Sequence, residues 1–362
     1  MSITKRLAGL IWISLLIANL WGGVEDIPQV PAGVIGAQDS LFDAALVAGR
    51  KFILADRYEE AVAYYDSILT LYPEQPGPHF FLAATYQSWM GTYRISAYQE
   101  PLEKHVNETI RLGEKLLETR PEDPWLNFYI GAAYGYRAFF KVLSFNFIGA
   151  YLDGRKGIDN LETCLDKNPE IYDVYLGLGS YHYWRTARSK FIRVVAFWMS
   201  DLRDLGLKQI RFAAEHGRYS RPECMLGLVV AYFDYEKYDE GLEALAWYNE
   251  SYDYKLLTSY YYHGRLLMAK KRYQEAIPQF EEMLRGLHKE PGSALGFAIE
   301  CNYWIAKAYR EMGDKSKALH YAGLGVADLE KRNDQAELDG PFESFSDIKD
   351  KLKDLHKELS KS

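Results

Sequence analysis

Three cysteines are the most reactive side chains in this 362-residue chain. Cys164, Cys224 and Cys301 lie 60 and 77 residues apart, each in an apolar stretch with helical spacing. Thiolates can bind zinc or form disulfides, but zinc sites usually need closely spaced pairs such as Cys-x-x-Cys. An odd number of widely spaced cysteines also gives no disulfide framework. The spacing therefore predicts three buried thiols.

Motifs of common enzymes are not found. The sequence has no Gly-rich phosphate-binding loop, no His-Glu-x-x-His and no Gly-x-Ser-x-Gly. Among eight dispersed histidines, only His182 has a markedly aromatic setting, and we expect it to be a packed core residue. Gly177-Leu-Gly179 and Gly323-Leu-Gly325 resemble half of a dinucleotide fingerprint, but no strand precedes them, so we expect close helix contacts there. We therefore expect no catalytic residue, no metal and no cofactor.

Composition favours a folded binding protein. Hydrophobic residues make up 48% of the chain and aromatic residues 15%, with 29 Tyr. Such rings supply a core and can also line an accessible groove. The net charge of -7 argues against broad nucleic-acid binding, which needs a concentrated positive face. We expect no nucleic acid among the partners.

Residues 1-37 have the pattern of an export signal and linker. Lys5 and Arg6 precede an apolar run from Leu7 to Trp21, and a Pro-containing stretch follows. The run is shorter than the roughly 18 to 20 residues that a membrane-spanning helix needs. This pattern predicts an exported protein, periplasmic or secreted. Because Ile35-Gly-Ala37 is an imperfect cleavage site, an uncleaved N-terminal membrane anchor stays open as the alternative.

One short phrase recurs along the rest of the chain. It appears as Tyr58-Glu-Glu-Ala61, Tyr238-Asp-Glu-Gly241 and Tyr273-Gln-Glu-Ala276. In the first unit, the small residue Gly49 is followed by Phe52 on the preceding helix, and Pro73 closes the unit. A small residue permits close helix approach, and proline ends a helix.

This pattern resembles the tetratricopeptide repeat family, whose helical hairpins repeat about every 34 residues. The resemblance implies an all-α, right-handed superhelical solenoid of about seven helix pairs over residues 38-340. More loosely, the chain is similar to bacterial exported members of unassigned function with elongated middle repeats. A repeat scaffold of this kind implies protein or peptide binding rather than catalysis.

The middle repeats are enlarged. Pro73, Pro121 and Pro169 are each 48 residues apart, which places extra residues between the two helices of each middle unit. The predicted insertions are 88–99, 139–153 and 186-201. The last is very hydrophobic and headed by basic residues, so it either lies on an anionic membrane surface or packs against its neighbour.

The C-terminal residues 341-362 form a charged stretch with one narrow apolar stripe. Phe345, Ile348, Leu352, Leu355 and Leu359 provide that stripe. A helix with one apolar face is suited to closing the open end of a solenoid. We expect a capping helix, with a partner-binding tail as the alternative.

The groove lined by the first helix of each pair is the predicted binding site. Helical projection places eleven side chains there, aromatic at the centre and basic toward the C-terminal end. A peptide with aromatic or aliphatic anchors and an acidic end would suit them, because Arg presents a planar fork to carboxylates. The predicted set is Arg50, Phe80, Gln87, Phe128, Tyr136, Tyr183, Trp184, Tyr261, Arg265, Lys307 and Arg310.

The sequence thus predicts a non-catalytic binding or assembly scaffold for a protein or peptide partner, in the bacterial cell envelope. The alternative is a transport accessory or receptor that holds a small apolar or anionic ligand between the middle insertions.

Overall fold

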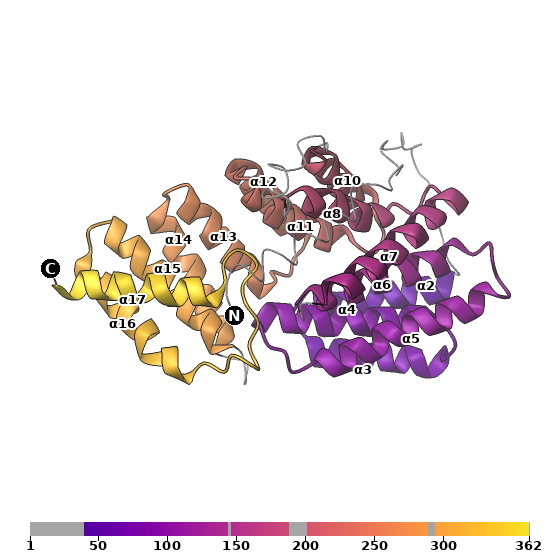
Figure 1. The fold of residues 1–362 in the computed structure, drawn as a ribbon, viewed down its shortest axis with the longest axis horizontal. Helices are drawn as coiled ribbons and strands as arrows, with labels where there is room; N and C mark the ends of the chain where they lie inside the picture. Colours follow the sequence, from indigo (N-terminus) through magenta and orange to yellow (C-terminus); the bar gives the residue numbers. More distant parts are fainter. Residues whose placement is uncertain (1–39, 144–145, 188–200, 289–293, 362) are drawn as a thin grey trace. The chain divides into compact units, whose positions relative to one another are not determined.

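The computed structural model describes residues 40–143, 146–187, 201–288 and 294–361. Within these residues the chain is all-α, apart from one isolated antiparallel bridge between Ile95 and Glu337. In the described ranges, seven helix pairs follow one another along the chain and a single helix comes last (Figure 1). The predicted all-α repeat fold is confirmed. The predicted export signal, and most of the segment 186–201, lie outside the described residues.

The seven pairs have the following bounds. They are α2 (Ser40–Ile53) with α3 (Tyr58–Leu71), α4 (Pro76–Tyr93) with α5 (Gln99–Leu117), α6 (Pro124–Leu143) with α7 (Phe147–Lys167), α8 (Val174–Ala187) with α10 (Arg203–His216), α11 (Arg221–Asp234) with α12 (Tyr238–Ser251), α13 (Leu257–Ala269) with α14 (Tyr273–Leu287), and α15 (Leu295–Glu311) with α16 (Lys315–Asp328). The short 3₁₀ helix η1 (Leu329–Lys331) and helix α17 (Phe345–Lys361) follow them.

The chain forms two compact units. Unit 1 comprises the described residues up to Gly49, together with Ala63–Ala83 and Glu103–Leu228. Unit 2 comprises Arg50–Val62, Ala84–Leu102 and Val229–Ser362. Helices α2 to α5 and α11 contribute residues to both. Each unit is described separately below.

The recurring phrase marks the start of a second helix after a fixed turn. Asp56, Glu236 and Lys271 adopt left-handed backbone conformations, with φ of 56°, 60° and 58°, two residues before α3, α12 and α14 begin. In each case the backbone N–H of the next residue donates to the carbonyl oxygen five residues before it, at 2.9 Å. Gly313 and Arg94 hold the same position after α15 and α4. This Schellman closure satisfies carbonyl groups that the helix end leaves unpaired.

Pairs of glycines let the helices of unit 1 cross closely. A Cβ added at Gly179 of α8 would lie 2.7 Å from the carbonyl oxygen of Gly206 of α10. Gly131 and Gly157 have the same relation between α6 and α7. The expected close contact is thus confirmed at Gly179. In the second motif it is confirmed at Gly325, where an added Cβ would lie 2.9 Å from the Leu352 side chain, but it is wrong at Gly323, where an added Cβ would meet nothing within 4 Å.

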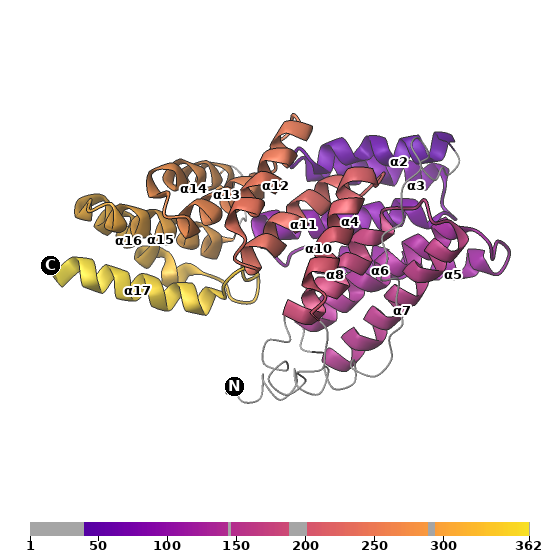
Figure 2. The ribbon, with the colours of Figure 1, turned by 90° about the horizontal axis from the view of Figure 1, so that it is seen from above.

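The extra residues of the middle repeats lengthen helices instead of forming separate insertions. Helices α4 to α7 are 18, 19, 20 and 21 residues long, whereas α2 and α3 have 14 each. Figure 2 shows α6 and α7 as long antiparallel neighbours. The predicted insertions 88–99 and 139–153 are therefore corrected to mostly helical extensions. A continued helix satisfies its own backbone hydrogen bonds, which an extended loop cannot do.

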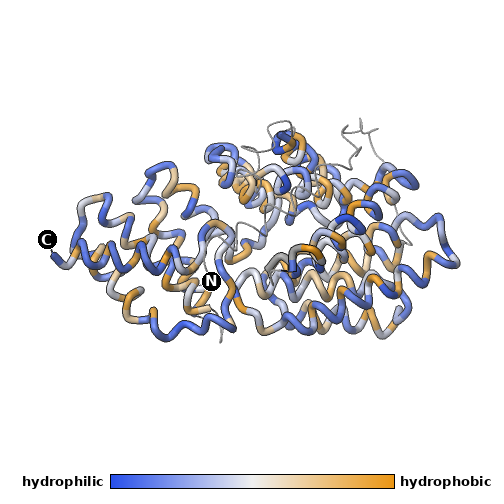
Figure 3. The backbone as a smooth tube through the Cα atoms, in the orientation of Figure 1, coloured by the Kyte–Doolittle hydropathy of each residue, from blue (hydrophilic) through white to orange (hydrophobic). Residues whose placement is uncertain are grey.

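Helix α17 packs on α15 and α16 within unit 2. Ile348, Leu352, Leu355 and Leu359 are buried, while most of its other residues are hydrophilic (Figure 3). The three cysteines are buried and unpaired by disulfides, as predicted. None of the helices in the described ranges is both long and apolar enough to cross a membrane.

Candidate binding site

A shared carboxylate organises the surface between α5, α6 and α7 in unit 1. Asp153 of α7 accepts two hydrogen bonds from Arg137, at 2.8 and 3.0 Å, and pairs with Lys141 at 2.5 Å. Burial opposes ionisation of Asp153, but hydrogen bonds from Arg137 and Lys141 outweigh it and lower its pKa. Both cations come from one face of α6, because residues four apart align on a helix.

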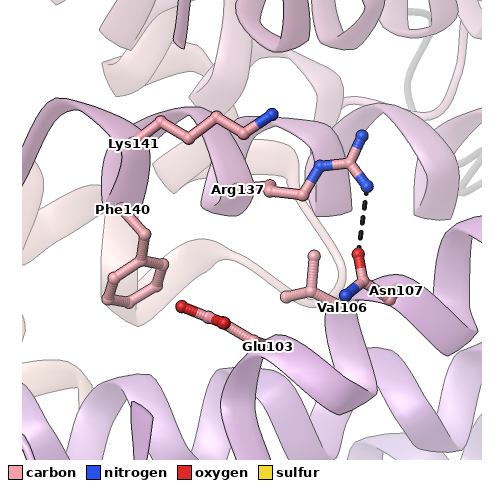
Figure 4. Close-up of a pocket in the computed structure, with 6 residues that line it drawn as sticks. All are labelled: Glu103, Val106, Asn107, Arg137, Phe140 and Lys141. Carbon is pink, nitrogen blue, oxygen red and sulfur yellow. Dashed lines mark hydrogen bonds between the residues drawn. The ribbon is translucent and has the colours of Figure 1, made fainter. Parts of the chain in front are cut away.

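A small cavity lies beside this cluster, with a volume of about 160 Å³. Its lining is Glu103, Val106 and Asn107 from α5, with Arg137, Phe140 and Lys141 from α6 (Figure 4). Val106 and Phe140 give the cavity apolar walls. Arg137 spans the two helices by donating to the Asn107 side chain at 3.0 Å. An apolar cavity with a few fixed polar groups at its rim is suited to holding one side chain of a ligand.

The α6–α7 hairpin next to the cavity exposes large apolar side chains. Phe139 is 51% exposed, Ile148 72% and Leu152 55%. Scattered apolar residues are common on surfaces, but three on one hairpin beside a cavity have the composition of a contact site. The sequence projection missed this surface because it left out α5 and α7, and on α6 it selected Phe128 and Tyr136 instead of the side that carries Arg137 and Lys141. The spacing of Arg137 and Lys141 was the available signal.

Three of the predicted groove residues of unit 1 meet in an aromatic cluster. Phe80 stacks on Tyr136 with ring centroids 5.7 Å apart, and its centroid lies 6.0 Å from that of Phe128. Phe80 and Phe128 are buried, whereas Tyr136 is half-buried. Tyr183 is fully buried beside half-buried Trp184.

Tyr219, from the turn before α11, covers this aromatic cluster. Its ring lies 5.4 Å from both Phe81 and Trp125. Asp173 fixes the turn by accepting the backbone N–H groups of residues 218–220 at 2.7 to 2.9 Å. The Tyr219 hydroxyl donates to Asp43 of α2, which also pairs with Arg218. A long-range contact of this kind leaves no signal in helical periodicity.

In unit 2, the predicted residues Tyr261 and Arg265 belong to a buried ionic cluster around Glu300. The Glu300 carboxylate accepts from Tyr261 at 2.7 Å and from Arg265 at 3.1 Å, and it pairs with Arg94 at 2.5 Å. Trp304 donates a further hydrogen bond at 3.1 Å. Burial opposes ionisation of Glu300, yet the two guanidinium groups outweigh it and lower its pKa.

The basic end of the predicted groove is paired internally. Arg310 is exposed and binds Glu358 of α17 at 3.0 Å. Lys307 is half-buried with its ammonium 5.0 Å from the Trp304 ring centre, and burial lowers its pKa. Arg50 and Gln87 are half-buried. Five of the eleven predicted residues lie inside their units and are not accessible to a partner: Phe80, Phe128, Tyr183, Tyr261 and Arg265.

No group of His, Cys, Asp and Glu side chains in the described residues could hold a metal ion. His182 is buried and its Nδ1 lies 2.7 Å from the Gln209 side chain, as expected for a core residue. His79 and His105 form a second buried contact, with their Nδ1 atoms 2.8 Å apart. Burial is the main cause that lowers both pKa values, that of His105 to about 4.

These elements define an all-α helical-repeat fold with two units and a C-terminal helix. No protein-family model and no curated protein matches the sequence. Similarity to solved structures is confined to the fold.

Three solved structures illustrate this similarity. The APC/C hetero-tetramer Cut9–Hcn1 is 14% identical with a TM-score of 0.50, covering 81% of this chain and 48% of that one. The C-terminal part of a TPR repeat-containing protein from Cytophaga hutchinsonii is 16% identical, with a TM-score of 0.41 and coverage of 80% and 97%. A Rap protein complexed with competence and sporulation factor is 15% identical, with a TM-score of 0.46 and coverage of 82% and 79%.

Proposed function

We propose that this chain is a non-catalytic binding protein that recognises a segment of a protein partner on the α5–α6–α7 surface of unit 1. The observation that carries the proposal is the cavity between α5 and α6, lined by Val106 and Phe140 and rimmed by fixed polar groups. One apolar side chain of the partner enters this cavity. Neighbouring partner residues contact the exposed Phe139, Ile148 and Leu152.

The size of the cavity supports a side chain as the occupant. Pockets that enclose drug-sized ligands usually measure about 300–1,000 Å³, and this one measures about 160 Å³. Binding energy at protein interfaces concentrates in a few anchors that fill desolvated pockets. The similar Cut9–Hcn1 structure is itself a hetero-tetramer, so a repeat fold of this kind is compatible with holding a second chain.

A displayed peptide library tests the proposal. The immobilised full chain is used to select peptides, and the affinity of the enriched peptides is measured for wild type, Phe140→Ala and Ile148→Ser. Truncation of an anchor contact typically costs more than about 1.4 kcal/mol, which is a tenfold loss of affinity. We expect at least that loss for both variants.

The matched control is Leu324→Ser on α16, which removes an apolar side chain that is also exposed, at 45%. It should leave the affinity unchanged. Peptides that bind all four proteins equally would contradict the proposal, as would failure to enrich any shared apolar anchor.

A receptor for a small apolar or anionic molecule is the second candidate. It is favoured by the position of the cavity, which adjoins the elongated α6–α7 hairpin. The two candidates differ in what is recovered with the native protein. A receptor should copurify a small molecule that raises the melting temperature, whereas a scaffold should recover a protein.

Export to the bacterial envelope is also proposed, on the basis of Lys5, Arg6 and the apolar run that follows. Mass spectrometry of the mature N-terminus checks it. Loss of about the first 37 residues is the expected result, and an intact N-terminus would favour a retained anchor. We also propose that segment 186-201 contacts a membrane surface.

A further inference from the structure

The segment 333–343 of unit 2, called the strap below, contains no helix and joins η1 to α17. Residues 333–336, 339 and 341 are exposed. Glu337 is part-buried, accepts a hydrogen bond from the Gly296 N–H at 2.7 Å and pairs with Arg332. Its backbone bonds with the turn after α4: Leu338 donates to Arg94 at 2.8 Å, and Ser96 donates to Ala336 at 2.9 Å.

Two strap side chains reach the helices that the sequence assigned to a binding groove. The Phe342 ring stacks on Tyr261 at 5.9 Å between centroids and lies 4.0 Å from the Phe233 ring. Glu343 accepts a hydrogen bond from Arg265 at 2.7 Å. Arg265 also lies 5.1 Å from the Phe342 ring centre. An aromatic ring and the adjacent carboxylate thus fit one receptor surface on α11 and α13.

The receptor surface contains two buried cations, Arg94 and Arg265. Arg94 and Arg265 both bind Glu300, so two guanidinium groups share one internal carboxylate. Arg94 is buried and its Nη2 has no hydrogen-bond partner. Gly340 of the strap lies directly over it, since an added Cβ would lie 2.9 Å from Nη1. Glu343 supplies the second carboxylate to this pair of cations.

We propose that the strap is a built-in ligand, and that its place is a second binding site for a partner segment in which an aromatic residue is followed by an acidic one. Such a segment would stack on Tyr261 and Phe233 and bind Arg265. This site lies in unit 2 and is independent of the α5–α6–α7 surface. A tethered ligand acts at an effective concentration of about millimolar, so only a partner that binds more tightly displaces it.

A labelled peptide with the sequence of residues 338–347 tests the proposal by fluorescence anisotropy. The receptor is the full chain carrying Phe342→Ser and Glu343→Ser, which removes the two strap side chains that contact Tyr261, Phe233 and Arg265. We expect the peptide to bind this variant at least tenfold more tightly than wild type. A peptide with serine in place of Phe342 and Glu343, or a receptor that also carries Arg265→Gln, should lose that binding.

The matched control receptor carries Gln335→Ser and Ala336→Ser, two exposed positions in the same segment. It should bind the peptide no better than wild type. A well-folded Phe342 and Glu343 variant that does not bind the peptide would overturn the proposal, as would equal binding of a scrambled peptide.

Hydrogen exchange of the wild type gives a second test that needs no variant. If the strap detaches as a unit, the amides of Ser96 and Leu338 should exchange at least tenfold faster than those of α13 and α15. If the amides of Ser96 and Leu338 exchange as slowly as those of α13 and α15, at the rate of global unfolding, the strap is a fixed part of the core.

Discussion

In unit 1 the first helices are covered by one aromatic ring, Tyr219, whose turn is held by the carboxylate of Asp173. In unit 2 they are covered by Phe342 and Glu343, which meet a buried network centred on Glu300. In each unit, residues of the same chain therefore cover the surface that a repeat array often offers to a partner. The difference is that the covering residues of unit 2 join a network in which two Arg share Glu300, whereas the covering ring of unit 1 packs on aromatic side chains and is fixed by Asp173 and Asp43.

Replacing Glu300 should have the largest effect. Glu300→Ala would leave Arg94 and Arg265 buried without their shared carboxylate. Breaking a buried ion pair by removing one partner typically costs about 3–5 kcal/mol. Urea unfolding of the variant should show a loss of that size in the free energy of unfolding. A loss below about 1 kcal/mol would mean that water already solvates the network.

The corresponding change in unit 1 is Asp173→Ala, which removes the acceptor of three backbone N–H groups and of the Ser220 hydroxyl. Hydrogen bonds to a charged group contribute about 1.5–3 kcal/mol, and we expect a total loss of about 2–3 kcal/mol. Near-ultraviolet circular dichroism should also change, because Tyr219 loses its fixed position. An unchanged aromatic signal would contradict the role assigned to this turn.

Acid should weaken unit 1 through the histidine pair. The pKa of His105 is about 4 in the folded chain and about 6.5 when unfolded. The neutral form is thus favoured by folding, so its contribution is complete above pH 6.5 and is lost as the pH falls toward 4. The loss reaches about 2–3 kcal/mol by linkage. His105→Gln should flatten the stability profile between pH 4 and 6.5; an equally steep profile would exclude the pair as its cause.

Rising pH, rather than acid, should destabilise unit 2, and the group responsible is Asp56. Burial raises its pKa to about 6, so stability is fully present below the unfolded value near 3.9 and declines as the pH rises through 6. Asp56→Asn keeps an acceptor for the Leu257 N–H and tolerates the left-handed backbone. The variant should be about 1–3 kcal/mol more stable at pH 8. At pH 3.5 the two proteins should unfold at the same urea concentration.

The smallest expected effect concerns the left-handed turns. Lys271 has a φ of 58°, a conformation that costs a residue with a Cβ about 1–2 kcal/mol. Lys271→Gly relieves that cost but adds freedom to the unfolded chain, so the net gain should be below about 1 kcal/mol. A thermal melt should show a slightly higher midpoint. A lower midpoint would indicate that the Lys271 side chain stabilises the turn.

The helix pairs could be predicted because their signals are local. The phrase beginning at Tyr58, Tyr238 and Tyr273 lies next to a turn that the immediate sequence determines. The stripe from Ile348 to Leu359 likewise predicted a buried face, and that face is buried on α17. Both patterns depend only on residues within one or two helical turns.

The groove was harder to predict because periodicity shows which side of a helix a residue occupies, but not what covers that side. Phe128 is covered by Tyr219, which is 91 residues further along the chain, and Tyr261 by Phe342, 81 residues further along. The cavity between α5 and α6 was also missed, because its lining comes from two helices of different pairs. Such surfaces depend on tertiary packing.

Photo-crosslinking of a selected peptide to the wild-type chain tests the central claim most directly. The peptide carries a photoreactive group beside its apolar anchor, and the crosslinked residues are mapped by mass spectrometry. We predict crosslinks on α5, α6 and α7, around Phe140 and Ile148, while the strap still covers α13 and α15. Crosslinks concentrated on α13 and α15, with none on the α6–α7 hairpin, would contradict the account.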